Sequence, residues 1–130
     1  MVPMIEACHH FAVVVTDAER ARAFYGGLLG LEEIERPPEI AKRIPGAWYR
    51  IGRSELHVFE QRDFQPPKGP IGPHVAFRCG DFDTTVEKLR AGGCEFRFGP
   101  DRDSTGVARV ILNDPTGNTV EITDAALHHA

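Results

Sequence analysis

HFAVVVTD (residues 10–17) and HVAFRCGD (residues 74–81) are the two stretches that decide the fold of this chain. Each begins with a histidine, continues with a largely apolar run and ends with an aspartate, and the second stretch follows the first by 64 positions. A short apolar run of this kind predicts a β-strand, and an aspartate directly after it predicts the N-cap of a helix. We therefore expect the same structural unit to occur twice.

The residues after each aspartate support this repeat. Apolar residues with helical spacing follow Asp17, at Ala21, Phe24, Tyr25 and Leu28. The same spacing occurs in the second stretch, at Phe82, Val86 and Leu89, where either Asp81 or Asp83 could be the N-cap. Glycines predict the helix ends, at Gly30 and at Gly92-Gly93. Three strands are predicted after each helix, at about 31–36, 47–52 and 55–61, and then at 94–98, 107–113 and 118–124.

The predicted fold class is α+β, with two tandem βαβββ units at about 6–62 and 72–125. A linker rich in proline and glycine, residues 65–73, joins them. We expect one domain over residues 1–130, in which the units form a curved, open mixed-sheet barrel around a metal cleft.

Composition excludes several classes of function. A net charge of −4 without a basic run does not favour nucleic acid or a membrane surface, and no run of 18 apolar residues could span a bilayer. The N-terminal segment lacks the pattern of a signal peptide. Three cysteines without paired spacing (Cys8, Cys79, Cys94) do not predict disulfides. We expect a cytoplasmic protein.

Strand alternation predicts which side chains share a face. Phe11, Val13 and Val15 should face the helix, which leaves His10 on the opposite face. By the same rule the last strands place His57 and Glu121 opposite the helix side, and His74 corresponds to His10. His10 and His57 are 47 positions apart, as are His74 and Glu121. His9 shares parity with the core-facing residues, so we expect it to be structural.

Three imidazoles and a carboxylate suit one divalent metal ion, Zn²⁺, Ni²⁺, Co²⁺, Mn²⁺ or Fe²⁺. The metal ligands predicted by the matched spacing are His10, His57, His74 and Glu121. The alternative is four half-buried polar residues on a solvated sheet face, which would not explain the equal spacing.

Other residues on the same face indicate the ligand. A two-residue turn at Arg53-Ser54 would pair Arg50 with His57. The predicted substrate-binding residues are Trp48, Arg50, Phe59, Arg78 and Arg109. Arginines and aromatic rings near a metal favour a small, anionic, partly apolar molecule, although each arginine could instead be a solvated or ion-paired surface residue.

At these residues the chain resembles the vicinal oxygen chelate superfamily, which includes glyoxalase I, bleomycin resistance proteins, methylmalonyl-CoA epimerase, fosfomycin-resistance thiol transferases and extradiol dioxygenases. HFAVVVTDAERARAFYGGLLGLE resembles the opening strand and helix of the family, HVAFRCGDFD its second-unit start, and NDPTGNTVEI its closing turn and ligand strand. The resemblance implies that His10, His74 and Glu121 are metal ligands. His57 stands where glyoxalase I has glutamate and the epimerase glutamine.

The resemblance implies a metal-dependent lyase or isomerase that moves a proton on a substrate with vicinal oxygens, with Glu121 as the catalytic base. Val14 and Gln61 stand where glyoxalase I has an arginine and an asparagine for glutathione, so glutathione is not favoured. The alternatives are an Fe²⁺ ring-cleaving dioxygenase of extradiol type and a non-catalytic antibiotic-binding resistance protein. Small two-unit members commonly form symmetric dimers with shared sites, which implies a homodimer.

Overall fold

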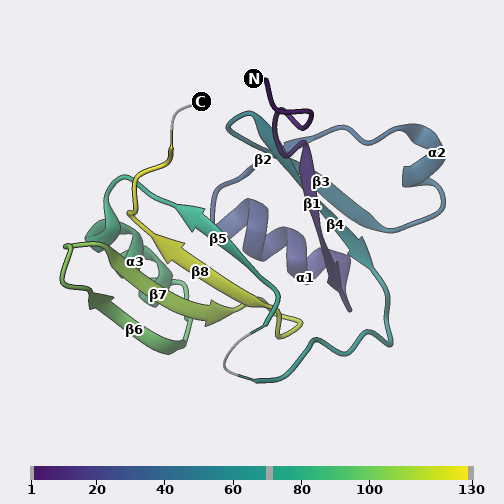
Figure 1. Ribbon diagram of the computed structural model, residues 1–130. Helices are drawn as coiled ribbons and strands as arrows, with labels where there is room; N and C mark the ends of the chain where they lie inside the picture. The colour runs from purple at the N-terminus through teal and green to yellow at the C-terminus, as the bar shows by residue number, and fades with distance from the viewer. Residues whose placement is uncertain (1, 70–71, 129–130) are drawn as a thin grey trace. The chain divides into compact units, whose positions relative to one another are not determined.

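The computed structural model describes residues 2–69 and 72–128, so Pro70 and Ile71 of the predicted linker lie outside the described residues. The chain divides between Phe64 and Gln65 into two compact units, each of which carries a four-stranded sheet (Figure 1). The first unit contains β1 (His10–Val15), α1 (Ala18–Arg22), the π-helix η1 (Ala23–Leu28), β2 (Glu32–Ile34), α2 (Pro38–Ala41), β3 (Gly46–Ile51) and β4 (Ser54–Glu60). The second contains β5 (His74–Arg78), α3 (Phe82–Ala91), β6 (Phe96–Arg102), β7 (Ala108–Asn113) and β8 (Thr119–Thr123).

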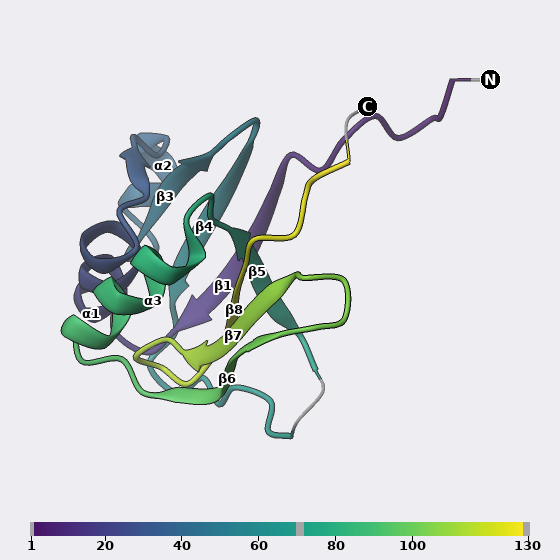
Figure 2. The same cartoon turned by 90° about the vertical axis from the view of Figure 1, so that its left-hand side faces the viewer.

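The first sheet has the strand order β1-β4-β3-β2. β1 pairs in parallel with β4, and the other pairs are antiparallel. The side chains on one face of this sheet are buried, and Figures 1 and 2 both show α1 beside that sheet. The buried residues of the sheet and of the helical segment are Val13, Val15, Ala21, Phe24, Tyr25, Tyr49, Leu56 and Val58. Burial of their apolar surface is the main stabilising contribution in this unit.

The helix of the first unit begins where the sequence predicts. The Asp17 carboxylate accepts hydrogen bonds from the backbone N–H groups of Glu19 and Arg20, at 3.0 and 3.1 Å. Such a cap satisfies donors that the first helical turn leaves without partners. Gly30, with φ of +73°, follows the helical segment, a conformation that glycine adopts without strain.

The second sheet repeats the first, with the order β5-β8-β7-β6 and β5 parallel to β8 (Figure 2). Asp81 caps α3 by accepting a hydrogen bond from the Thr84 N–H at 3.0 Å, whereas the alternative, Asp83, lies within the first turn. The apolar core of this unit consists of Phe77, Phe82, Val86, Leu89, Ala108, Val110, Leu112, Val120 and Ile122.

The pairing register confirms the repeat. In the first unit His10 pairs with Glu55 and Ala12 pairs with His57. In the second unit, at positions 64 residues later, His74 pairs with Thr119 and Ala76 pairs with Glu121. Each predicted ligand pair is therefore diagonal across a parallel strand pair, on the face opposite the apolar core. The predicted fold class, two βαβββ units with open mixed sheets, is confirmed.

Two local predictions are wrong. The β3–β4 turn is at Gly52-Arg53, with Gly52 at φ of +57°, so that Trp48, and not Arg50, is opposite His57. A register error of two residues leaves every side chain on its predicted face, because strand side chains alternate with a period of two. The sixth strand runs over Phe96–Arg102 and not over 94–98, with irregular pairing to β7 around the Gly99-Pro100 peptide.

The short helix α2 was not predicted either. It begins with Pro38, and proline suits the first helical position because it needs no N–H partner there. None of the helices in residues 2–69 and 72–128 has the length and apolar character needed to cross a membrane.

Candidate functional site

The first unit contributes two stacked imidazoles. The rings of His10 on β1 and His57 on β4 lie 4.1 Å apart between centroids, with an interplanar angle of 16°. This proximity follows from the diagonal register described above. The two rings come from strands that are far apart in sequence, so their contact depends on the parallel β1–β4 pairing.

His57 is enclosed on both faces. The residue is 4% exposed, and the Trp48 indole stacks on its ring with 3.7 Å between centroids and an interplanar angle of 1°. Phe59 approaches the same imidazole edge-on, with 6.3 Å between ring centroids. The predicted neighbours Trp48 and Phe59 therefore lie against a predicted ligand, and they restrict its orientation.

Sequence reasoning missed Glu55. Its Oε1 lies 2.9 Å from Nε2 of His57, and this hydrogen bond is the main cause that lowers the pKa of the Glu55 carboxyl below its ordinary value. A carboxylate that binds one imidazole nitrogen leaves the other nitrogen, here Nδ1, for a metal. The available signal was the spacing of two residues, which places Glu55 and His57 on one strand face.

The position of His9 differs from the prediction that it lies on the core-facing side of the strand. It precedes β1, is exposed, and its ring lies edge-on to that of His10 with 5.2 Å between centroids. The two Nδ1 atoms are 3.0 Å apart. Strand alternation does not apply to a residue outside the strand, so its parity carried no information about burial.

The second unit contributes His74 and Glu121. Nδ1 of His74 is 2.9 Å from the Gly72 carbonyl oxygen, and Nε2 is 3.7 Å from Oε1 of Glu121. A carbonyl can only accept a hydrogen bond, so Nδ1 is the donor in this contact and Nε2 is the ring nitrogen that faces the carboxylate. This arrangement, with one ring nitrogen donating to a carbonyl, is typical of metal-binding histidines. Both side chains line a cavity of about 180 Å³.

The donor types in each pair suit a divalent metal. Imidazole nitrogen and carboxylate oxygen are the ligands that Zn²⁺, Fe²⁺ and similar ions take from proteins. Among the described residues of either unit, no three His, Cys, Asp or Glu side chains form a group that could hold a metal ion. Each unit therefore brings two of the predicted ligands together, His10 with His57 and His74 with Glu121.

The three predicted substrate-binding arginines each have a polar partner. Nε of Arg50 is 3.4 Å from Oε2 of Glu32, and Nε of Arg78 donates to the carbonyl of Ala125 at 2.8 Å. Arg109 is the one that contacts a predicted ligand, with Nε 3.7 Å from Oε2 of Glu121. Its guanidinium can help to orient that carboxylate.

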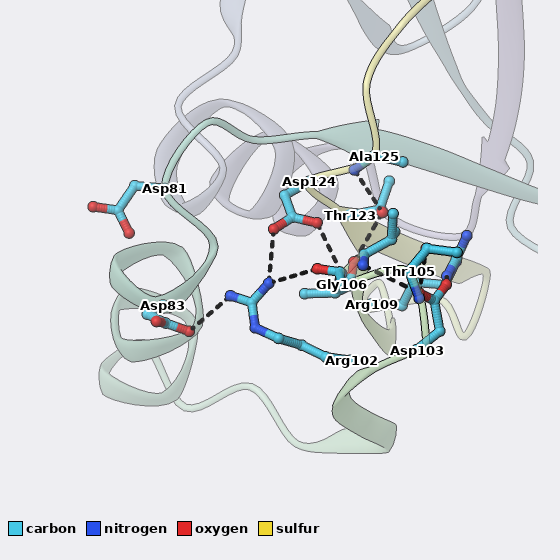
Figure 3. Close-up of polar contacts among 12 residues, drawn as sticks. Asp81, Asp83, Arg102, Asp103, Thr105, Gly106, Arg109, Thr123, Asp124 and Ala125 are labelled. Carbon is cyan, nitrogen blue, oxygen red and sulfur yellow. Dashed lines mark hydrogen bonds and ion pairs between the residues drawn. The ribbon is translucent and has the colours of Figure 1, made fainter.

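Asp103 holds Arg109 from the other side. Oδ2 of Asp103 accepts a hydrogen bond from Nη1 of Arg109 at 2.8 Å, as Figure 3 shows. Hydrogen bonds from the Thr105 hydroxyl, from Arg109 and from the backbone N–H groups of Thr105 and Val107 keep the pKa of the Asp103 carboxyl well below its ordinary value. The loop after β6 therefore fixes the position of Arg109.

Arg102 anchors the same loop. It donates to the Gly106 carbonyl at 3.0 Å and to Asp124 at 3.2 Å, and it lies 3.7 Å from Asp83 of α3 (Figure 3). These ion pairs are exposed and individually weak, but they share one guanidinium. The loop is therefore tied to both α3 and the end of β8.

Comparisons with known proteins agree with this architecture. The family model of the Glyoxalase/Bleomycin resistance protein/Dioxygenase superfamily matches residues 7–122. The Escherichia coli protein YaeR is 28% identical over 129 residues, which is 91% of this chain and 95% of that protein. A solved Bacillus anthracis structure, described as a glyoxalase family protein, is 34% identical with a TM-score of 0.81 and covers 95% of this chain and 98% of its own. The lactoylglutathione lyase of Agrobacterium tumefaciens is 25% identical with a TM-score of 0.69, over 92% and 93% of the two chains.

Proposed function

This chain belongs to the glyoxalase/bleomycin resistance protein/dioxygenase superfamily, and from that membership we propose that it is a divalent-metal-dependent enzyme of glyoxalase type. It would act as a lyase or isomerase on a small anionic substrate with vicinal oxygens, by metal-assisted proton transfer. Members of the superfamily typically use a divalent metal. The solved lactoylglutathione lyase with the same fold supports a reaction of this class.

The observation that carries the proposal is the repeated register of the ligand pairs. His10 and His57 occupy the same two positions in the first unit as His74 and Glu121 in the second. Side chains of ligating type therefore occupy equivalent register positions in the two repeats. These four residues would hold the metal, with Nε2 of His74 already oriented by the Gly72 carbonyl.

Each residue has a defined role in this proposal. When bound, the metal supplies Lewis-acid stabilisation for negative charge that develops on the substrate oxygens. A carboxylate oxygen of Glu121 accepts the proton from one substrate carbon and returns it to the neighbouring carbon. Arg109 orients the Glu121 carboxylate through its contact with Oε2. Trp48 and Phe59 exclude water from the imidazole of His57.

A second function is favoured by one observation. Nε2 of His57 is engaged with Glu55, and its ring is confined between two other rings. If His57 does not ligate, the remaining set is two histidines and one carboxylate, which suits Fe²⁺ oxygenases. A ring-cleaving dioxygenase of extradiol type is therefore the alternative.

The metal content of the purified protein tests the proposal. Protein purified without added metal should contain about one zinc, nickel, cobalt or manganese ion per chain, measured by elemental analysis. Replacement by alanine of His10, His74 or Glu121 should abolish this metal, whereas His57→Ala should weaken binding less and His9→Ala, the matched control, should leave it intact. Iron, together with oxygen consumption on a catechol, would instead support the dioxygenase, and loss of metal in His9→Ala alone would contradict the face assignment.

A further inference from the structure

A cavity in the second unit has a cationic wall that the proposed mechanism does not use. Its volume is about 180 Å³, and its lining includes the predicted ligands His74 and Glu121. The same lining contains Lys68 and Arg97, neither of which was predicted from the sequence to bind substrate. A space of this volume corresponds to about six water molecules, which suits a small acid of a few carbons.

Arg97 is held beside His74. Its Nη1 donates to Oγ1 of Thr119 at 3.2 Å, and its guanidinium carbon lies 5.9 Å from the ring centroid of Phe98. Thr119 is the residue that pairs with His74 across the β5–β8 strand pair. Adjacent strands lie about 4.8 Å apart, so the Arg97 guanidinium is hydrogen-bonded to Thr119, the residue next to the predicted metal ligand His74.

Arg97 also differs from two of the three arginines that were predicted from the sequence to bind substrate. Arg50 and Arg109 have carboxylate partners, Glu32 and Asp103, respectively. Within residues 2–69 and 72–128, no Asp or Glu oxygen forms an ion pair with Arg97. A guanidinium has five N–H donors in a planar fork that matches the two oxygens of a carboxylate.

We infer that Arg97 forms an anion-binding subsite beside His74 and Glu121, and that the substrate carries a carboxylate in addition to its vicinal oxygens. The inference rests on the proposed function for the position of the vicinal oxygens. The recognised substrate class is a small dicarboxylic acid with a 2-hydroxy or 2-oxo group, with Arg97 on the remote carboxylate and Lys68 adding positive charge to the same wall.

The test compares the affinities of two acids, which differ by one carboxylate, for the wild-type protein and two arginine variants. Binding of 2-hydroxyglutarate and of 2-hydroxybutyrate, which lacks the second carboxylate, is measured by calorimetry on the full-length protein, both metal-free and loaded with Mn²⁺. The variants are Arg97→Ala and the control Arg90→Ala, an exposed arginine of the same unit that lies over the Phe96 ring and does not line the cavity. Thermal unfolding checks that both variants are folded.

The wild-type protein and Arg90→Ala should bind the dicarboxylate about tenfold more tightly than the monocarboxylate, and Arg97→Ala should abolish this preference. Absence of the preference in the wild type, or its persistence in Arg97→Ala, would overturn the inference. The two proposals fail separately. An Arg97-dependent preference in a protein that takes up no Mn²⁺ would refute the metal-dependent function alone, and Mn²⁺-dependent binding of both acids with equal affinity would refute the subsite alone.

Discussion

Gly46 at the start of β3 should not tolerate any side chain. Gly46 is buried and pairs with Phe59 of β4. A Cβ at this position would overlap the carbonyl oxygen of Val58, which is a backbone atom that cannot rotate away. The backbone of Gly46 does not have a positive φ, so Gly46→Ala introduces no conformational strain and its effect is steric.

The magnitude follows from the neighbouring hydrogen bonds. Relief of the overlap requires β3 to move away from β4, which weakens pairing near the hydrogen bond from Glu60 N–H to the Pro45 carbonyl, now 2.8 Å. Overpacking costs about 1–3 kcal/mol and each weakened backbone hydrogen bond about 1 kcal/mol, so we expect a loss of about 2–4 kcal/mol in the free energy of unfolding. For a chain of this size the loss corresponds to a decrease in Tm of about 10 °C.

The assay is urea unfolding followed by circular dichroism, with Gly27→Ala as the matched control. Apart from the backbone of its own helix, a Cβ at Gly27 would meet no described atom within 4 Å, and alanine should stabilise this helical position by about 0.4–1 kcal/mol. Since Val58 adjoins His57, Gly46→Ala should also reduce metal affinity, and Gly27→Ala should not. Equal stability of the wild type and Gly46→Ala would refute the close approach of β3 to the Val58 carbonyl.

Two further predictions concern assembly and acid stability. We propose a homodimer whose metal sites take one ligand pair from each chain, so equal amounts of His10→Ala and Glu121→Ala protein, mixed and reassociated, should regain about a quarter of the wild-type metal content by elemental analysis, because about half of the dimers are then mixed and each mixed dimer has one intact site of its two. Sedimentation as a monomer, or no recovery of metal, would contradict the shared site. For acid stability, hydrogen bonds from the Thr84 N–H and hydroxyl lower the pKa of Asp81 in the folded protein. This carboxylate therefore stabilises the fold above its unfolded pKa of about 4, and the contribution is lost as the pH falls through the lower folded pKa. Asp81→Asn keeps a cap that does not titrate, so its difference in unfolding free energy from the wild type should shrink between pH 5 and pH 2 in urea titrations, and a constant difference would exclude this linkage.

The sequence by itself determined the repeat and the equivalent positions of the two predicted ligand pairs. Strand and helix periodicities are local properties, and a repeat of 64 positions is visible without knowledge of any contact. The predicted helix cap at Asp17 was confirmed for the same reason, because a cap involves residues two and three positions away. The shared face predicted for His10, His57 and Trp48 was also correct, because their rings stack on one another, even though the register of the β3–β4 hairpin was not.

Only the tertiary structure decided what each site residue touches. The stack of Trp48 on His57 depends on the turn at Gly52, since one glycine with positive φ sets the pairing of the whole hairpin. The stack of His10 on His57 depends on the parallel pairing of β1 with β4, which are far apart in the sequence. The groups that bind the arginine side chains could not be predicted from the sequence, for a related reason. A long side chain can reach several strands and loops, and irregular pairing around Gly99-Pro100 changes which of them lies within its reach.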